Sequence, residues 1–180
     1  MKLCLYGAAS DTVPAVYLTE TERLGEMLAR RGHGMIFGGG ASGMMGAAAR
    51  GVHRGGGHIT GVAPRFFDVP GVLTPLCDEL IITETMDERK AVMRDRADGF
   101  IAAPGGIGTL DEFFEVLTLR TLSRHKKPVA VFNVDGYYDD LIGFLRRMEA
   151  QTFVSPALWD SLGVFRDPAA LLDYIEARAE

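Results

Sequence analysis

Three short apolar runs in this chain lead directly into glycine-rich turns, and a helical pattern follows each turn. The runs end at Tyr6, Phe37 and Ala103. Continuous apolar runs of this length indicate strands that are buried on both faces. Because such strands alternate with helical patterns, the sequence predicts an α/β fold in which helices cover both faces of a parallel sheet. Ligands of such folds bind beyond the carboxyl ends of the strands, so the three turns should gather there.

The rest of the chain continues this alternation. Further strands are expected at residues 59–63, 80–82, 128–132 and 164–165, and helices at 14–31, 47–52, 85–97, 113–119, 138–148, from 155 and from 168. Proline and glycine interrupt the pattern over residues 64–75, which predicts a surface loop and a candidate lid over the site. With 180 residues and no linker, residues 1–180 are expected to form one domain.

Composition narrows the possible partners. A net charge of −5 argues against sequence-independent binding of a nucleic acid polymer, which needs clustered lysine and arginine. Cys4 and Cys77 lie outside any metal-ligand spacing, so we expect free thiols in a reducing compartment. The histidines also lack metal-ligand spacing, and no serine lies in a GxSxG elbow. With no recognisable signal peptide or membrane span, a cytoplasmic protein without a metal site is expected.

The strongest candidate for chemistry is the stretch at residues 104–112. Its glycines leave bare backbone N–H groups at the start of a helix, where the helix dipole favours a phosphate. Glu112 follows about one helical turn later, and its carboxylate would repel that phosphate. The carboxylate must therefore cap the helix or meet sugar hydroxyls and developing positive charge. A capping box formed by Thr109 and Glu112 is the structural alternative.

A second glycine turn, at residues 38–46, has the same position between a strand and a helix. It contains the GxGxxG spacing, but the strand at residues 59–63 does not end in a ribose-binding acid, so the support for NAD is weak. Neither turn is a P-loop. Thr85 and Glu88 predict a capping box, and Arg89 in the following helix enters where an anion would sit. A solvated helix face is the simpler interpretation of Arg89.

Taken together, these stretches resemble the LOG ("lonely guy") family. The resemblance covers nearly the whole chain, in the family's order, at residues 37–40, 43–46, 86–90, 104–112, 133–138 and 153–156. It implies a Rossmann-like three-layer fold and a homodimer or a larger assembly of dimers. It also implies hydrolysis of the N-glycosidic bond of a cytokinin riboside 5′-monophosphate or AMP, without a cofactor, giving free base and ribose 5-phosphate. Family members have often been labelled lysine decarboxylases, but no lysine site for pyridoxal phosphate is evident here.

Arg89 and Glu112 are the catalytic pair that the resemblance implies. The implied substrate-binding residues are Ser10, Gly39, Gly40, Gly43, Met44, Lys90, Gly105, Gly106, Ile107, Gly108, Thr109, Leu110, Asp111 and Thr118. The chain departs from the family at residues 6–10, where the family often has Cys-Gly-Ser-Ser, at Asp87, where it often has histidine, and at residues 119–121, where it has Trp-Ala-Gln. These changes bear on base preference and oligomer type.

We expect hydrolysis through an oxocarbenium-like transition state. The amides of residues 105–109 would hold the 5′-phosphate, while Glu112 would orient the ribose, stabilise positive charge at C1′ or activate water. Arg89 would either neutralise the departing base or clamp the nucleotide. Two alternatives from other classes remain: a nucleotide or molybdenum-cofactor carrier without chemistry, and an NAD-type oxidoreductase.

Overall fold

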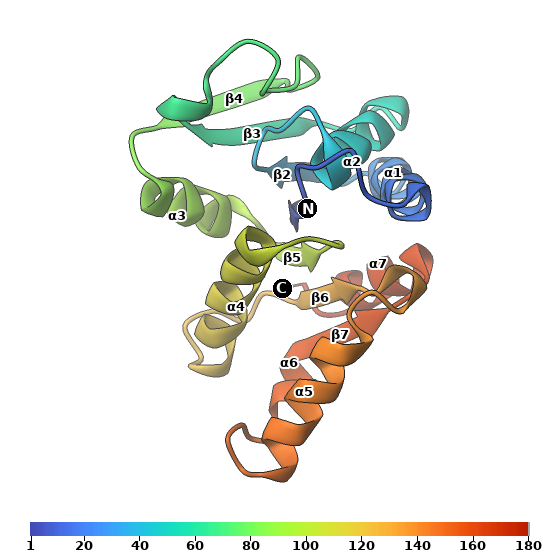
Figure 1. The fold of residues 1–180 in the computed structure, drawn as a ribbon, viewed down its shortest axis with the longest axis vertical. Coiled ribbons are helices and arrows are strands. Elements are labelled where there is room, and N and C mark those ends of the chain that lie inside the picture. Colours follow the sequence, from blue (N-terminus) through green and yellow to red (C-terminus); the bar gives the residue numbers. More distant parts are fainter. Residues whose placement is uncertain (180) are drawn as a thin grey trace.

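Seven parallel strands form one sheet within residues 1–179, which are the residues that the computed structural model describes (Figure 1). The strands are β1 (Lys2–Tyr6), β2 (Gly34–Phe37), β3 (Ile59–Pro64), β4 (Glu79–Thr83), β5 (Gly99–Ala102), β6 (Val129–Phe132) and β7 (Leu162–Phe165). Their order across the sheet is β4-β3-β2-β1-β5-β6-β7, and every neighbouring pair is parallel. The strands predicted from the apolar runs are therefore confirmed.

Helices cover both faces of this sheet (Figure 1). They are α1 (Ala15–Arg30), α2 (Gly43–Arg54), α3 (Met86–Arg96), α4 (Ile107–Thr121), α5 (Asp139–Ala150), α6 (Leu158–Ser161) and α7 (Pro168–Glu176), with 3-10 turns η1 (Arg65–Phe67) and η2 (Val134–Gly136). Side chains of a strand alternate between faces. Leu3 and Leu5 of β1 pack with α1, α2 and α7, whereas Cys4 and Tyr6 pack with α3, α4, α5 and α6. The three-layer Rossmann-like architecture is confirmed.

One helix boundary differs from the sequence prediction in a way that matters for the site. The sequence placed the helix after β5 at residues 113–119, but α4 begins at Ile107. Gly108 lies in its first turn without interrupting it, because the first turn of a helix tolerates residues that would be costly further in. Only residues 103–106 therefore connect β5 to α4, and Glu112 lies in the second turn of the helix.

The segment at residues 64–75 is a surface loop in its first half, as predicted, but it is fastened to the second glycine turn further on. Residues 65–72 are exposed. Beyond them Leu73 forms an antiparallel bridge with Gly40, and Thr74 N donates to Gly39 O at 2.8 Å. Ala41 N donates to Val72 O at 2.9 Å on the other side of this bridge. The loop thus covers the glycine turn, and its role as a lid stays a prediction.

Candidate functional site

The three glycine turns meet at the carboxyl edge of the sheet, beside the switch point between β1 and β5. The turn after β1 connects the other two, because Ala8 N donates to Pro104 O at 3.1 Å and Ala8 O accepts from Met44 N at 2.8 Å. Gly43 lies so close to this turn that a Cβ there would clash with Ala8 O, and its φ of 61° favours glycine. The prediction that the turns gather at one edge is confirmed.

The amino end of α4 is open and uncapped. Its N-cap is Gly106, and no side chain caps the helix. The first amides of a helix have no partner within the helix, so they are available to an anion. A Cβ at Gly106 or Gly108 would meet no atom within 4 Å. Neither has a positive φ, so the backbone does not require glycine there, and the absence of side chains leaves room for a ligand above the amides.

Glu112 does not form the capping box that was the structural alternative. Its carboxylate accepts from Arg89 instead, with Nη1 2.5 Å from Oε1. The capping box predicted at Thr85 and Glu88 does form and starts α3, with Glu88 N 3.1 Å from Thr85 Oγ1 and Thr85 N 3.4 Å from Glu88 Oε2. The two amino ends are thus built differently. Glu88 caps its own helix, α3, whereas Glu112 does not cap α4 and is available for another role.

The Arg89–Glu112 ion pair is buried, and neighbouring backbone groups fix its geometry. The two side chains are only 8% and 11% exposed. Arg89 Nε donates to Val62 O of β3 at 3.1 Å, so both the hydrogen bond and the ion pair fix the guanidinium plane. A Cβ at Gly38 would clash with Arg89 Nη2, so the glycine after β2 provides the space for the arginine. The structure therefore brings together the two residues predicted to be catalytic, from α3 and α4.

Burial sets the electrostatics of this pair. Burial raises the pKa of the Glu112 carboxyl above its ordinary value, and the charge of Arg89 opposes that rise. A carboxylate that has lost solvent is a stronger base and interacts more strongly with a nearby positive charge than one in water. Helix residues four apart lie on one face and their side chains lean toward the amino end, so Glu112 is on the same face of α4 as Gly108. The pair can thus act on a group held by the open amides of α4.

Lys90 and Asp111, both predicted to contact substrate, lie in a second ion-pair cluster between α3 and α4. Lys90 Nζ is 3.1 Å from Asp111 Oδ2 and 2.9 Å from Glu115 Oε2, and Arg94 Nη1 is 2.7 Å from Glu115 Oε1. The hydrogen bond to Glu115 and then that to Asp111 raise the pKa of Lys90 against the effect of burial. This cluster ties α3 to α4 next to the Arg89–Glu112 pair, and substrate contact by its members stays a prediction.

Apart from Thr118, the remaining predicted substrate-binding residues lie in three settings. Gly39 and Gly40 are buried beneath the loop at residues 72–74, and Met44 is fully buried, with its Sδ 3.3 Å from Thr21 Oγ1. Ser10 is exposed, and its Oγ lies 2.8 Å from Thr12 Oγ1. Those at the start of α4, which are Gly105, Gly106, Ile107, Gly108, Thr109 and Leu110, surround the open amides. Contact with substrate is a prediction for all of them.

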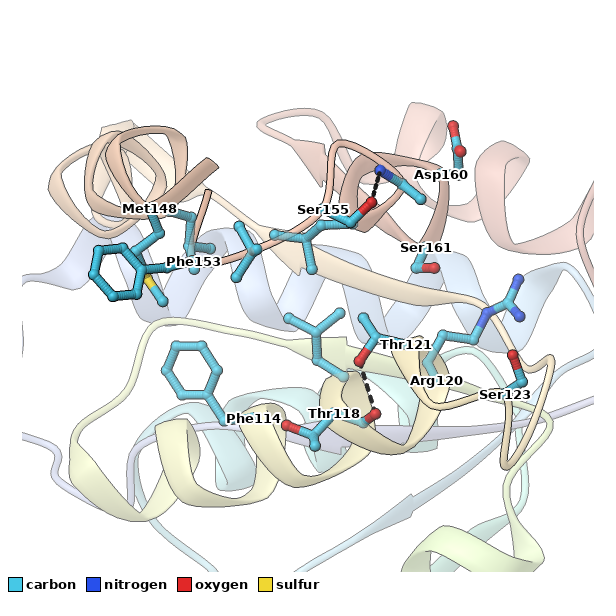
Figure 2. A pocket seen from close by; sticks show the side chains of 15 residues that line it. Phe114, Thr118, Arg120, Thr121, Ser123, Met148, Phe153, Ser155, Asp160 and Ser161 are labelled. Atoms are coloured by element: carbon cyan, nitrogen blue, oxygen red, sulfur yellow. Dashed lines mark hydrogen bonds between the residues drawn. The ribbon is translucent and has the colours of Figure 1, made fainter. Parts of the chain in front are cut away.

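Thr118 faces a different cavity. A groove of about 620 Å³ lies between α4 and the region of α5 and α6. Figure 2 shows Thr118 and Phe114 on one wall of this groove and Met148 and Phe153 on the other. Neither Arg89 nor Glu112 lines it. Phe153 is 75% exposed at this groove. The structure therefore separates Thr118 from Arg89 and Glu112, the two residues predicted to be catalytic, within one chain.

The segment after β6 also contacts the site, although its sequence alone predicted no role for it. There Tyr137 Oη donates to Gly105 O at 2.9 Å and Tyr138 Oη donates to Ala103 O at 2.7 Å. Both tyrosines thus touch the connection between β5 and α4. The position of residues 133–138 directly after a strand was a usable signal, since the ends of parallel strands share one edge.

Within residues 1–179, no group of three or more His, Cys, Asp and Glu side chains could hold a metal ion. No helix of the described chain has the length and apolar character needed to cross a bilayer.

Comparison with known proteins identifies relatives. A family described as "Possible lysine decarboxylase" matches residues 45–175. A probable cytokinin riboside 5′-monophosphate phosphoribohydrolase of Oryza sativa subsp. japonica is 41% identical over 155 residues, covering 86% of this chain and 63% of the relative. A second probable phosphoribohydrolase of this kind from the same organism is 34% identical over 176 residues, which cover 98% of this chain and 70% of that relative. A cytokinin riboside 5′-monophosphate phosphoribohydrolase of Arabidopsis thaliana is 37% identical over 155 residues, covering 86% and 71%. The chain thus spans 63% to 71% of these relatives.

Solved structures with the same fold include a molybdenum cofactor carrier protein from Chlamydomonas reinhardtii, with a TM-score of 0.73, 20% identity and coverage of 98% of this chain and 96% of that one. A molybdenum cofactor binding protein from Rippkaea orientalis has a TM-score of 0.72 and 20% identity, covering 98% and 94%. At these identities the similarity shows the fold alone.

Proposed function

This chain belongs to the LOG family of cytokinin riboside 5′-monophosphate phosphoribohydrolases, and we propose that it hydrolyses the N-glycosidic bond of a purine riboside 5′-monophosphate, such as a cytokinin nucleotide or AMP. The products are the free base and ribose 5-phosphate. The relatives at 34% to 41% identity are named as cytokinin riboside 5′-monophosphate phosphoribohydrolases, two of them as probable ones, which supports this proposal. Lysine decarboxylation, which the family description suggests, has no such support among these relatives.

One observation carries the proposal: Glu112 is bound to Arg89 and does not cap α4, while the amides at the start of the same helix are open. Glu112 follows Gly108 by four residues, or about 6 Å along the helix axis. That separation is comparable with the length of a ribose 5-phosphate. A phosphate on the amides therefore brings the anomeric carbon of its sugar to the carboxylate.

In the reaction, the bond between C1′ and the purine nitrogen breaks, and its electron pair leaves with the base, which gains a proton from solvent. Water adds to C1′ and loses a proton to Glu112, which then returns it to solvent, so one water is consumed overall. Before water adds, positive charge develops at C1′, and the poorly solvated carboxylate stabilises it. Arg89 keeps the carboxylate oriented toward the sugar through its hydrogen bond and ion pair.

The test is a chromatographic assay for base released from AMP and from isopentenyladenosine 5′-monophosphate. Release of free base together with ribose 5-phosphate supports the proposal. Tight nucleotide binding without base release would instead indicate a carrier protein, and hydride transfer with a nicotinamide cofactor would indicate an oxidoreductase.

Substitution of Gly108 by alanine should have opposite effects on two quantities: it should raise the stability of α4 and weaken ligand binding. Alanine removes glycine's conformational freedom, so we expect the variant to be about 0.5 to 1 kcal/mol more stable in urea unfolding. The new methyl group projects into the open space above the amides, so we expect KM for the monophosphate to rise at least about tenfold. Gly143→Ala in α5 is the matched control, since its Cβ also meets no atom within 4 Å. It should gain stability at unchanged KM, and an unchanged KM in both variants would contradict the phosphate position.

We also propose a cytoplasmic homodimer. Free cysteines at positions 4 and 77 support a reducing compartment. Leu122, Phe144 and Phe153 are 63%, 53% and 75% exposed, and a second copy would cover such large apolar surfaces. Light scattering should give a mass near twice the 19.5 kDa of one chain, and a mass that stays at one chain at micromolar concentration would contradict the dimer.

A further inference from the structure

We propose that Tyr137 and Tyr138 are positioning residues that make this site specific for the phosphorylated nucleotide. They hold the residues 103–106 connection so that its amides, and not its carbonyl oxygens, face the phosphate. The inference rests on the proposed function, because it concerns how the same site recognises the 5′-phosphate.

All four carbonyl oxygens of this connection already have donors. Ala103 O accepts from Tyr138 Oη at 2.7 Å, and Gly105 O accepts from Tyr137 Oη at 2.9 Å. Of the other two, Pro104 O accepts from the backbone N of residue 8 at 3.1 Å and Gly106 O from that of residue 110 at 3.0 Å. An anion is repelled by free carbonyl oxygens and attracted by N–H groups. The donors therefore remove the repulsive groups from the phosphate site.

Peptide geometry links Tyr137 to a particular amide. The described chain has no cis peptide bond, so the C=O of Gly105 and the N–H of Gly106 point in opposite directions across one rigid plane. By holding Gly105 O, the Tyr137 hydroxyl fixes where Gly106 N–H points. Pro104 has no N–H, so Gly106 is among the first amides that this connection offers to a ligand. Without the hydroxyl, the C=O of Gly105 loses the side-chain donor that holds this peptide plane.

Hydrogen bonds and an unusual turn fix the position of the segment that carries Tyr137 and Tyr138. Asn133 is 4% exposed, and its side chain accepts from Tyr138 N at 2.7 Å and donates to Asp139 Oδ1 at 2.7 Å. Two residues that lie between Asn133 and Tyr138 have positive φ: 49° at Asp135 and 75° at Gly136. Two successive left-handed residues, one of them not glycine, cost conformational energy that the surrounding contacts must outweigh. The turn places both hydroxyls against the connection between β5 and α4.

Tyr137 is itself held by rings on two sides. Its ring packs edge-on against Tyr138 at 4.8 Å and against Tyr17 of α1 at 5.4 Å between centroids. It is 43% exposed, whereas Tyr138 is 3% exposed. Loss of the Tyr137 hydroxyl should therefore leave the packing and the fold intact. Loss of the buried Tyr138 hydroxyl leaves the carbonyl oxygen of Ala103 without this donor, so Tyr138→Phe should also lower stability.

The experiment compares AMP with adenosine as substrates of the parent and of Tyr137→Phe. We expect KM for AMP to rise roughly tenfold with kcat nearly unchanged, while kcat/KM for adenosine, which has no phosphate, stays the same. Tyr174→Phe is the control and should match the parent, since the buried Tyr174 hydroxyl on α7 has no hydrogen-bond partner among residues 1–179. Tyr138→Phe should shift the ratio of AMP to adenosine in the same direction, even if its thermal midpoint falls.

An unchanged KM for AMP in Tyr137→Phe, or an equal loss for AMP and adenosine, would overturn the inference and leave the proposed function standing. If the parent releases no base, the proposed function fails instead. In that case calorimetric titration with AMP decides the inference separately: weaker binding by Tyr137→Phe supports it, and equal binding overturns it.

Discussion

Replacing Glu112 with glutamine is expected to lower kcat for base release from AMP by at least about 100-fold. Glutamine has nearly the same shape and can still accept a hydrogen bond from Arg89, but it has no negative charge to stabilise C1′ and cannot take a proton from water. Circular dichroism and gel filtration would establish that the variant is folded. A rate within a few-fold of the parent would contradict the role assigned to Glu112.

Two further measurements make this result specific. Glu149→Gln is a control, because Glu149 also accepts hydrogen bonds, from Arg146 and Trp159, but on α5 away from the pair; it should keep the parent rate. The pH dependence is the second. Burial raises the pKa of Glu112, so kcat/KM of the parent should fall, as pH is lowered, at a higher pH than an ordinary glutamate would give. This acid limb should be absent from Glu112→Gln.

Replacing Arg89 should have an equally large effect on rate and a separate effect on stability. Lysine has one ammonium group and cannot reproduce both the bond from Nε to Val62 O and that from Nη1 to Glu112. We expect Arg89→Lys to lose at least about 100-fold in kcat/KM. Arg89→Met leaves the Glu112 carboxylate buried without a counterion, which should cost roughly 3–5 kcal/mol in urea unfolding near neutral pH.

The pH dependence and the double variant identify the cause of that loss. Without Arg89 the pKa of Glu112 rises further, so the destabilisation should shrink as pH falls and the buried carboxyl takes up a proton. Arg89→Met combined with Glu112→Gln removes both charges. It should recover much of the stability but none of the activity. Recovery of activity, or a stability loss that grows as pH falls, would contradict the buried ion pair.

The fold was largely predictable because the strands are buried on both faces. Continuous apolar runs that lead into glycine-rich turns located β1, β2 and β5, and parallel topology then placed these turns at one edge. The start of α4 was harder to predict. Glycines at 105, 106 and 108 indicate a loop, but only those at 105 and 106 lie outside the helix, and local sequence does not separate them.

The resemblance predicts a catalytic role for Arg89 and Glu112, but it did not predict the geometry of their ion pair. Arg89 and Glu112 are 23 residues apart, and they meet because α3 and α4 follow strands on either side of β1 and pack on the same face of the sheet. Whether Glu112 caps α4 or pairs with Arg89 depends on that packing. The clearance that Gly38 gives to Arg89 is likewise invisible in a linear pattern, since it depends on the side chain of another element.

The most direct test is a crystal structure of Glu112→Gln bound to AMP, since this variant should hold the nucleotide without cleaving it. We expect phosphate oxygens within hydrogen-bond distance of the amides at the start of α4, with C1′ facing the side chain of residue 112 and Arg89 beside it. A nucleotide seated elsewhere, with residue 112 turned onto the N–H groups of its own helix, would contradict the account.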